Sequence, residues 1–183
     1  MKNWFSSDYH LGHANIIKYC ERPFVDVEEM SATIIKNHNQ RVKKEDTVFF
    51  LGDFCFRNSP GGKEGEGKLD KAEFYINQLN GRFVFIKGNH DKNNSMKTPI
   101  ERVIIKYGGK KVCMVHNPIH ADSNYELNFV GHVHEKWKIR PLGETSIMVN
   151  VGVDVWGFKP ITYEEINKEV SKWKRSQKQT IKE

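Results

Sequence analysis

The chain has 183 residues, of which 38% are hydrophobic and 11% aromatic, and its formal net charge is +6. This length suits one domain with a substantial core and is too short for two full-sized domains, and the composition is too apolar for a disordered chain. No apolar run approaches the roughly 18 residues of a membrane-spanning helix. We therefore expect a single soluble domain over residues 1–175, followed by a basic tail over 176–183, with no membrane partner.

The three cysteines, Cys20, Cys55 and Cys113, are odd in number, far apart and not arranged in CxxC pairs. The N-terminus leads directly into a predicted strand and shows no signal-peptide pattern. Both features predict reduced, mostly structural thiols and a cytoplasmic protein.

The excess positive charge is concentrated near the C-terminus. Residues 168–183 contain six lysines and arginines and two glutamates, which leaves a net charge of +4. Such a stretch can bind the phosphates of a nucleic acid. It can equally be the solvated end of a helix, where cations interact favourably with the helix dipole. Both interpretations stay open at this point.

The first half of the chain predicts strands that alternate with helices. The expected elements are a strand at 3–5, a short helix at 13–20, a helix beginning at Asp26, a strand at 47–51, a helix spanning 69–79 and a strand at 82–87. Asp26 and Glu29 form a capping box, and the apolar residues that follow recur at spacings of three and four. His38 lies on the buried face that this spacing predicts, so we interpret it as a helix-face residue rather than a ligand.

A glycine-rich segment separates two of these elements. Residues 57–67 contain four glycines and one proline, which predicts a loop directly after Gly52-Asp53. A lid over a site and a flexible insertion are both compatible with this composition.

The second half predicts mainly strands. The expected elements are strands at 103–105 and 111–115 around a Gly108-Gly109 turn, strands at 128–130 and 146–151, and a helix opened by a capping box of Thr162 and Glu165. Strand–helix units followed by a run of strands and one helix predict an α/β fold. The fold has a mixed sheet, or two sheets packed face to face, with helices outside.

Polar motifs follow the predicted strands. They are Asp8-x-His10, Gly52-Asp53, Gly88-Asn89-His90-Asp91, His116 and Gly131-His132-x-His134. Each motif alone is more often structural than metal-binding, but the loops at the strand ends of α/β folds gather into one site. Five motifs in a compatible order, each after a strand, therefore predict a shared site.

Oxygen and imidazole ligands together suit borderline ions such as Mn²⁺, Fe²⁺ and Zn²⁺ better than Ca²⁺. Two such ions can share a bridging carboxylate and lie roughly 3.5–4 Å apart, an arrangement used for in-line attack on phosphorus. We expect two divalent metal ions, with Mn²⁺ as the first choice and Fe, Zn or Ni as alternatives.

The ordered motifs resemble those of the calcineurin-like metallophosphoesterase superfamily, in its small single-domain prokaryotic and phage-type branch. The resemblance extends from Ser6 to about Glu165 and includes Asn150-Val151-Gly152-Val153-Asp154-Val155-Trp156. It is specific for the superfamily and not for a substrate. It implies a four-layer αββα sandwich, in which two mixed sheets pack face to face with helices outside and the site lies above the strand ends.

The resemblance also implies a ligand set. One ion would be held by Asp8, His10, Asp53 and His134, and the second by Asp53, Asn89, His116 and His132, with Asp53 as the bridge. A hydroxide between the ions would be the nucleophile, since metal binding lowers the pKa of water towards about 7.

Three further residues are implied as catalytic. His90 would stabilise charge on the phosphate or protonate the leaving oxygen. Arg57 matches the phosphate-binding arginine of the protein-phosphatase branch. That branch has an aspartate that orients the histidine where this chain has Phe56, so Asp91 is the candidate partner of His90. The departure argues against a protein phosphatase.

Four other residues allow two interpretations each. His13 could reach the metals or the phosphate, or could cap a helix, and His120 could contact substrate or nothing. Trp156 and Phe158 could stack on a base, although covering the sheet edge is the favoured interpretation.

The expected function is metal-dependent hydrolysis of a phosphodiester or phosphomonoester, with a small nucleotide-type molecule as substrate. One alternative is a nuclease with the same chemistry that follows the backbone of DNA or RNA with the basic C-terminal helix. Another is a non-catalytic scaffold with the same fold, which the presence of His90 and all seven implied ligands disfavours. The sequence makes no prediction of the oligomeric state.

Overall fold

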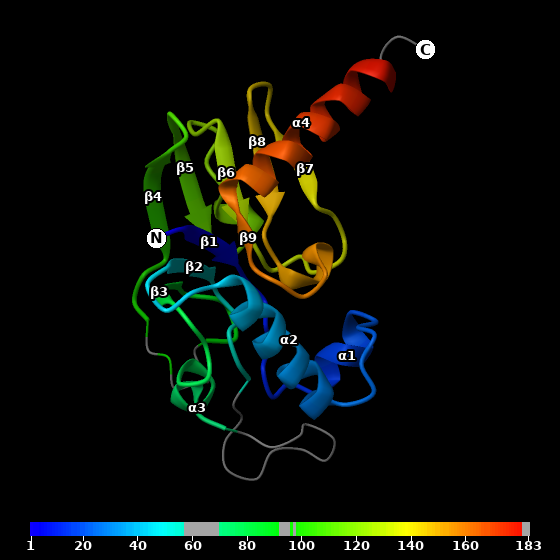
Figure 1. Ribbon diagram of the computed structural model, residues 1–183. Coiled ribbons are helices and arrows are strands. Elements are labelled where there is room, and N and C mark those ends of the chain that lie inside the picture. The colour runs from blue at the N-terminus through cyan, green and yellow to red at the C-terminus, as the bar shows by residue number, and fades with distance from the viewer. Residues whose placement is uncertain (57–69, 92–95, 97, 181–183) are drawn as a thin grey trace.

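The structure is a computed structural model that describes residues 1–56, 70–91, 96 and 98–180 (Figure 1). These residues form a four-stranded sheet in the order β3-β2-β1-β9 and a five-stranded sheet in the order β4-β5-β6-β8-β7. The first sheet contains β1 (Asn3–Ser6), β2 (Thr47–Leu51), β3 (Arg82–Ile86) and β9 (Ile161–Thr162). The second contains β4 (Arg102–Tyr107), β5 (Lys110–Val115), β6 (Leu127–Val130), β7 (Ile139–Leu142) and β8 (Ser146–Asn150).

Both sheets are mixed. β1, β2 and β3 are parallel, and β9 pairs with β1 in the antiparallel sense. β5, β6 and β8 are also parallel, whereas the edge strands β4 and β7 are antiparallel to their neighbours. Within each sheet, three parallel strands therefore end at the same edge, where their following loops can form a site.

The two sheets enclose the main hydrophobic core. Its buried members from the sheets include Phe5, Leu51 and Ile86 on one side and Val112, Met114, Leu127, Phe129, Ile147 and Val149 on the other. The rings of Phe5 and Phe129 meet edge to face with their centroids 4.9 Å apart. Because successive side chains of a strand point to opposite faces, these residues direct one face of each sheet inward, which confirms the expected sandwich of two mixed sheets with helices outside.

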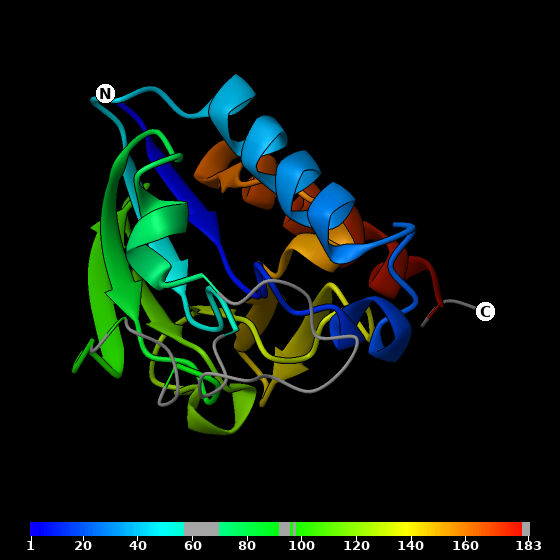
Figure 2. The same cartoon turned by 90° about the horizontal axis from the view of Figure 1, so that it is seen from below.

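The four helices of the described residues are α1 (Asn15–Tyr19), α2 (Val27–Arg41), α3 (Ala72–Ile76) and α4 (Tyr163–Thr180). The first three pack on the outer face of the four-stranded sheet through a second core cluster. α2 begins as predicted, since the Asp26 carboxylate accepts a hydrogen bond from the backbone N–H of Glu29 (2.8 Å). Figure 2 shows the end of α2 beside the first turns of α4, where Arg41 forms an ion pair with Glu165 (2.7 Å).

α4 has the predicted capping box, because Glu165 accepts from the N–H of Thr162 (2.9 Å) and Thr162 accepts from the N–H of Glu165 (3.3 Å). Its buried residues Tyr163, Ile166 and Val170 join the core between the sheets, beside β9 and β1. The helix continues through Thr180, into the segment that the sequence predicted as a tail.

Three elements differ from the sequence predictions. β7 and β9 were not expected, because β9 has two residues and β7 contains Pro141, which edge strands tolerate. α3 covers Ala72–Ile76, which is shorter than the predicted 69–79. Two short 3₁₀ helices, Pro118–His120 and Val153–Trp156, also add to the expected elements.

His38 is a helix-face residue, as expected. Its ring lies between the Tyr9 hydroxyl (2.8 Å from Nδ1) and the Asn80 carbonyl oxygen (2.8 Å from Nε2). Two other expectations, the phosphate contact of Arg57 and the lid or insertion at 57–67, lie outside the described residues. None of the described helices is both long enough and apolar enough to cross a membrane.

Candidate metal centre

The seven implied ligands come together at the carboxyl ends of five strands. Asp8 and His10 follow β1, Asp53 follows β2, Asn89 follows β3, His116 follows β5, and His132 and His134 follow β6. The backbone N–H of His132 lies 3.1 and 3.0 Å from the two carboxylate oxygens of Asp8. Ser7 and Gly152 form a parallel bridge alongside this contact. The edges of the two sheets therefore meet at one place, and the site spans them.

Five of these residues have left-handed backbone conformations, with φ of 59° at Asp8, 51° at His10, 56° at Asp53, 71° at His132 and 49° at His134. Elsewhere in the described part of the chain, only Glu21 and Phe158 share this feature among residues other than glycine. A side chain with a Cβ atom makes this conformation unfavourable, and it persists where the surrounding structure holds it, often at functional sites. Backbone strain is thus concentrated at the candidate ligands.

Two motif glycines allow the loops to approach closely. Gly52 has φ of +86°, and a Cβ atom there would lie 2.7 Å from Nδ1 of His116 and 2.6 Å from the backbone nitrogen of Gly88. A Cβ atom on Gly88 would overlap the carboxylate of Asp53. These glycines let the ends of β2 and β3 touch, which brings Asp53 and Asn89 to the same point.

Asp8, His10 and His134 form the first group of donors, with ligand atoms all within 4.8 Å of one another. Asp8 is fully buried, and its carboxylate also accepts a hydrogen bond from the Ser7 hydroxyl (2.5 Å). Nε2 of His10 is buried and has no hydrogen-bond partner among the described residues, and Oδ2 of Asp53 lies 3.6 Å from it. A buried polar atom without a partner is costly, and a bound cation would relieve that cost.

Asp53, His116 and His132 form the second group, with the same limit of 4.8 Å. Oδ1 of Asn89 lies 2.9 Å from Nε2 of His116 and 2.8 Å from Nδ1 of His132, so the amide belongs to this group. Nδ1 of His116 donates to the Leu51 carbonyl oxygen (2.6 Å). Because Nδ1 carries a proton in this bond, Nε2 is the ring nitrogen that faces the site and that can bind a metal ion.

The Asp53 carboxylate lies between the two groups. Its Oδ2 is 3.6 Å from Nε2 of His10 in the first group and 3.3 Å from Nε2 of His116 in the second. Its Oδ1 accepts a hydrogen bond from the backbone N–H of His90 (2.9 Å). The position suits a carboxylate shared by two ions.

Behind the first group lies a series of ion-paired side chains that was not predicted from the sequence. Nδ1 of His134 lies 3.1 Å from Oδ2 of Asp154, and Asp154 pairs with Arg22 through two contacts of 2.7 and 2.9 Å. Arg22 also donates to the backbone carbonyls of Asp8 and Tyr9. A carboxylate on the far nitrogen of a metal-binding histidine orients the ring and raises its basicity.

One sequence signal pointed towards this part of the site, since Asp154 stands in the Asn150–Trp156 stretch that carries the resemblance. Arg22 carried no such signal. Cys20 also lies within 4.8 Å of His134 and Asp154. The fixed positive charge of Arg22 beside Asp154 disfavours a further cation at that point.

The pKa values of the ionisable groups in the site are shifted in different directions. Burial raises the pKa of Asp8 above its usual value, and burial lowers the pKa of His10 well below its usual value. Burial would also lower the pKa of His116 and of His134, but hydrogen bonds to Asp53 and to Asp154 outweigh it and raise these pKa values to about 9 and about 10. The buried carboxylates thus hold protons on two imidazoles, which bound cations would replace.

His90 is half-buried at the site, with its ring centroid 5.4 Å from that of His10. Asp91, the candidate partner of His90, directs its carboxylate towards backbone N–H groups: those of Gly88 (2.7 Å), Asp53 (3.1 Å) and Phe54 (3.3 Å). These hydrogen bonds hold the loop that carries Asn89 against the loop that carries Asp53. They favour a positioning role for Asp91.

The structure shows the surroundings of the four residues that allowed two interpretations each. His13 is buried and stacks on Phe56 with centroids 4.0 Å apart, and its Nδ1 lies 3.5 Å from Nδ1 of His10. His120 is exposed at the end of the first 3₁₀ helix. Trp156 donates from Nε1 to the Asn150 carbonyl (2.8 Å), and Phe158 packs against Phe24, which agrees with covering roles for both.

The chemistry of the donors fits divalent ions. Carboxylate oxygens, one amide oxygen and imidazole nitrogens are the ligand types that Mn²⁺, Fe²⁺ and Zn²⁺ accept together. The two geometric groups contain the same residues as the two expected ligand shells, with Asp53 between them. The first shell also has the buried, unpartnered Nε2 of His10, which a cation would satisfy.

No protein-family model matches the chain. The uncharacterized protein MJ1445 of Methanocaldococcus jannaschii is 40% identical to this chain over an alignment of 183 positions, gaps included, which covers 94% of this chain and 93% of that protein. The chain belongs to the same family as MJ1445. The Gene 66 protein of Mycobacterium phage L5 is a more distant relative of this chain, with 26% identity over 84% of this chain and 87% of the phage protein.

The fold is shared with a solved structure. The crystal structure of AQ665, a protein of unknown function from Aquifex aeolicus, superposes with a TM-score of 0.64 and 24% identity over 91% of this chain and 97% of that one. This likeness shows that the two chains share a fold, which in this chain is built on the two mixed sheets.

Proposed function

We propose that the protein is a phosphoesterase that uses two divalent metal ions, with Mn²⁺ as the first choice. The observation that carries the proposal is the convergence of oxygen and nitrogen donors from five strand ends into two groups, with the Asp53 carboxylate between them. In the proposed arrangement Asp8, His10, Asp53 and His134 hold one ion, and Asp53, Asn89, His116 and His132 hold the other.

When bound, the two ions supply charge that polarises the phosphoryl oxygens and lowers the pKa of the attacking water. The chain holds the candidate ligands in position and provides a proton donor. Asp91 and the two glycines hold the Asp53 and Asn89 loops in contact. His90, anchored by its N–H to Asp53, stands half-exposed beside His10, where its ring can face the phosphate.

The proposed reaction is hydrolysis by in-line displacement. A bond forms between the water oxygen and phosphorus as that water loses a proton to solvent, and the bond from phosphorus to the leaving oxygen breaks. Protonated His90 gives its proton to the leaving oxygen and regains one from solvent afterwards. Protonation matters most when the leaving group is a poor one, since a basic alkoxide gains most from the proton.

We propose a small phosphorylated molecule as the substrate, with a nucleotide as the favoured type. The nuclease alternative requires the basic C-terminal helix to lie along the path to the site. Figure 1 instead shows α4 extending away from the edge at which the arrowheads of β5 and β8 end. This placement favours a small substrate over a strand guided by that helix.

The test measures hydrolysis of bis-p-nitrophenyl phosphate and p-nitrophenyl phosphate by the Mn²⁺-bound protein, with Asn89→Ala and His90→Ala as variants. Asn89→Ala should lose metal and activity. His90→Ala should keep its metal and lose rate, more on a diester with an alkyl leaving group than on one with p-nitrophenolate. No hydrolysis by the wild type, with no effect of Asn89→Ala on metal content, would favour a non-catalytic scaffold.

A further inference from the structure

The loop after β1 turns back on itself directly behind His10. The backbone N–H of His13 donates to the carbonyl oxygen of His10 (3.0 Å), which closes a tight turn. Gly12 inside this turn has φ of +76°, a left-handed conformation that glycine adopts without steric cost. The turn therefore brings the side chain of His13 back beside the ring of His10.

Backbone contacts hold this loop against the chain that follows β2. Leu11 forms a parallel bridge with Cys55, and the carbonyl oxygen of Leu11 accepts a hydrogen bond from the backbone N–H of Phe56 (2.9 Å). This pairing places Phe56 beside His13, and the two rings stack with centroids 4.0 Å apart and planes 13° apart. Phe56 stands where the protein-phosphatase branch has an aspartate, so in this chain the position packs a ring against His13 and offers no carboxylate.

His13 lies behind His10, away from the place of a substrate. Only 5% of its surface is exposed. Its Nδ1 is 3.5 Å from Nδ1 of His10, whereas the other ring nitrogen of His10, Nε2, faces the Asp53 carboxylate. A distance of 3.5 Å is long for a hydrogen bond, and hydrogen bonds at catalytic sites often tighten when the complete complex forms.

Two other candidate ligands have a partner on the corresponding ring nitrogen. Nδ1 of His116 donates to a backbone carbonyl oxygen (2.6 Å), and Nδ1 of His134 lies 3.1 Å from the Asp154 carboxylate. Such a partner orients the ring of a metal-binding histidine and fixes the tautomer whose remaining nitrogen binds the metal. For His10 the nitrogen that has to carry the proton is Nδ1, and the polar atom beside it is Nδ1 of His13.

We propose that His13 is a positioning residue of the metal centre. Its Nδ1 accepts a hydrogen bond from Nδ1 of His10, and this bond holds the tautomer in which the Nε2 lone pair of His10 faces the ion. The inference rests on the proposed two-metal site and gives its first group of ligands an outer partner. Without an acceptor at this place, the proton of His10 is better held on Nε2, which lies 3.6 Å from the Asp53 carboxylate, and there it blocks the metal.

Two substitutions of His13 separate the hydrogen bond from the packing. His13→Asn keeps an acceptor at the place of Nδ1, because the amide oxygen is also bonded to Cγ, but it loses the stacked ring. His13→Phe keeps a ring against Phe56 and loses the acceptor. Calorimetric titration with Mn²⁺ should show an affinity for one of the two ions that is about 10- to 100-fold lower in His13→Phe and close to that of the wild type in His13→Asn.

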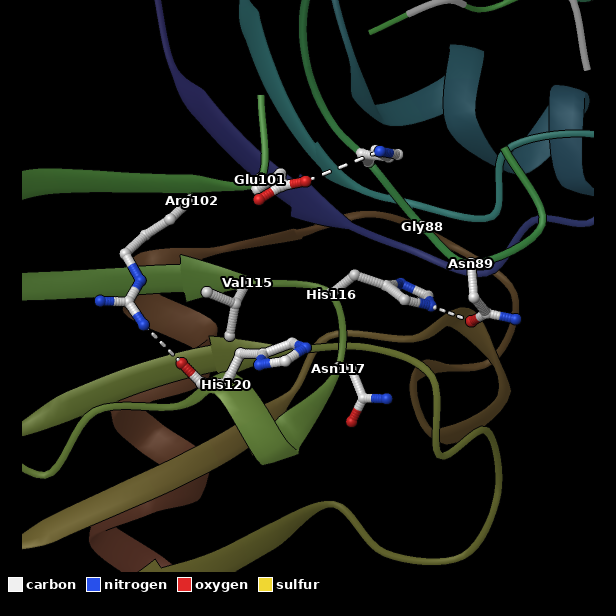
Figure 3. Close-up of a pocket in the computed structure, with 9 residues that line it drawn as sticks. Gly88, Asn89, Glu101, Arg102, Val115, His116, Asn117 and His120 are labelled. Atoms are coloured by element: carbon white, nitrogen blue, oxygen red, sulfur yellow. Dashed lines mark hydrogen bonds and ion pairs between the residues drawn. The ribbon is translucent and has the colours of Figure 1, made fainter. Parts of the chain in front are cut away.

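His120→Phe is the matched control. His120 follows the candidate ligand His116 closely in the chain, as His13 follows His10, but its side chain is exposed. Figure 3 shows it with His116 in the lining of a cavity of about 500 Å³. The same substitution at this position should leave both Mn²⁺ affinities unchanged. Melting temperatures in chelator show whether each variant is folded.

The tautomer of His10 provides a readout that depends on neither metal nor turnover. Long-range ¹H–¹⁵N spectra of the imidazoles, recorded in chelator, distinguish a proton on Nδ1 from a proton on Nε2. We expect the proton of His10 on Nδ1 in the wild type and in His13→Asn. In His13→Phe the population should shift towards Nε2.

The outcomes distinguish this inference from the proposed function. Equal Mn²⁺ affinities in wild type and His13→Phe, or a loss in His13→Asn that equals or exceeds the loss in His13→Phe, would overturn the hydrogen-bonding role. A wild-type protein that bound no Mn²⁺ would overturn it together with the metal centre. The expected order of affinities without any hydrolysis would support the role of His13 and count against the phosphoesterase function alone.

Discussion

Replacing Asp154 with asparagine removes the buried carboxylate that connects Arg22 to His134. The wild-type side chains are almost fully buried, at 0% exposure for Arg22 and 3% for Asp154, and their atoms meet at 2.7 and 2.9 Å. Asparagine has nearly the same shape, so the substitution leaves the packing in place. It removes the negative charge that balances a buried guanidinium.

The expected cost in stability follows from that uncompensated charge. Removing one partner of a buried ion pair costs about 3–5 kcal/mol. The amide oxygen of the asparagine would retain one hydrogen bond to Arg22, so we expect the lower end of that range. For a chain of this length, about 3 kcal/mol lowers the melting temperature by roughly 6–12 °C. Arg22 also holds the carbonyls of Asp8 and Tyr9, so the first donor group should loosen as well.

The expected cost in metal binding comes through His134. Loss of a carboxylate behind a metal-binding histidine weakens affinity about 10- to 100-fold. Denaturant unfolding in the presence of chelator measures the first effect, and calorimetric titration with Mn²⁺ measures the second. The first measurement reports the stability of the fold, and the second reports the affinity of the site for metal.

Glu165→Gln is the matched control. Glu165 also pairs with an arginine, Arg41, but their side chains are 40% and 24% exposed. Glutamine can keep the cap on α4 because it still accepts from the N–H of Thr162. We expect a loss of less than about 1 kcal/mol and no change in metal affinity. Equal losses in the two variants, or an unchanged Mn²⁺ affinity in Asp154→Asn, would refute the reasoning.

Three other predictions follow from the same geometry. Asp53→Ala should reduce the metal content of both groups, as measured by atomic emission, because one carboxylate lies between them; an unchanged content would contradict a shared ligand. Chelator should lower the melting temperature, by roughly 5–10 °C for each ion that is lost, relative to protein with Mn²⁺ at 100 times its Kd; an indifferent melting temperature would count against the site. Burial lowers the pKa of His38 to about 4, so the unfolded state binds more protons between pH 6.5 and 4, and stability is lost as the pH falls through that window. The loss should be about 3 kcal/mol and should be absent in His38→Gln in chelator-treated samples; parallel pH profiles would show that His38 is not the group responsible.

Local patterns determined much of the fold. The capping boxes at Asp26 and Thr162, the apolar spacing along α2 and the Gly108-Gly109 turn each act within a few residues, so the corresponding elements were predictable. β7 and β9 were not, because a two-residue strand and an edge strand with a proline have no alternation of their own. They form only because a neighbouring strand offers them hydrogen bonds.

The candidate ligands were visible in the sequence because each stands directly after a strand, and parallel strands bring their ends together. Two features of these residues are visible only in the tertiary structure. They are the left-handed backbone conformations and the position of the Asp53 carboxylate between the two groups of candidate ligands. Arg22 and Asp154 are 132 residues apart, and their pairing carries no local signal. The sequence thus determined which residues end the strands, while the tertiary structure decided which charges are buried together, because burial and distance are properties of the packed chain.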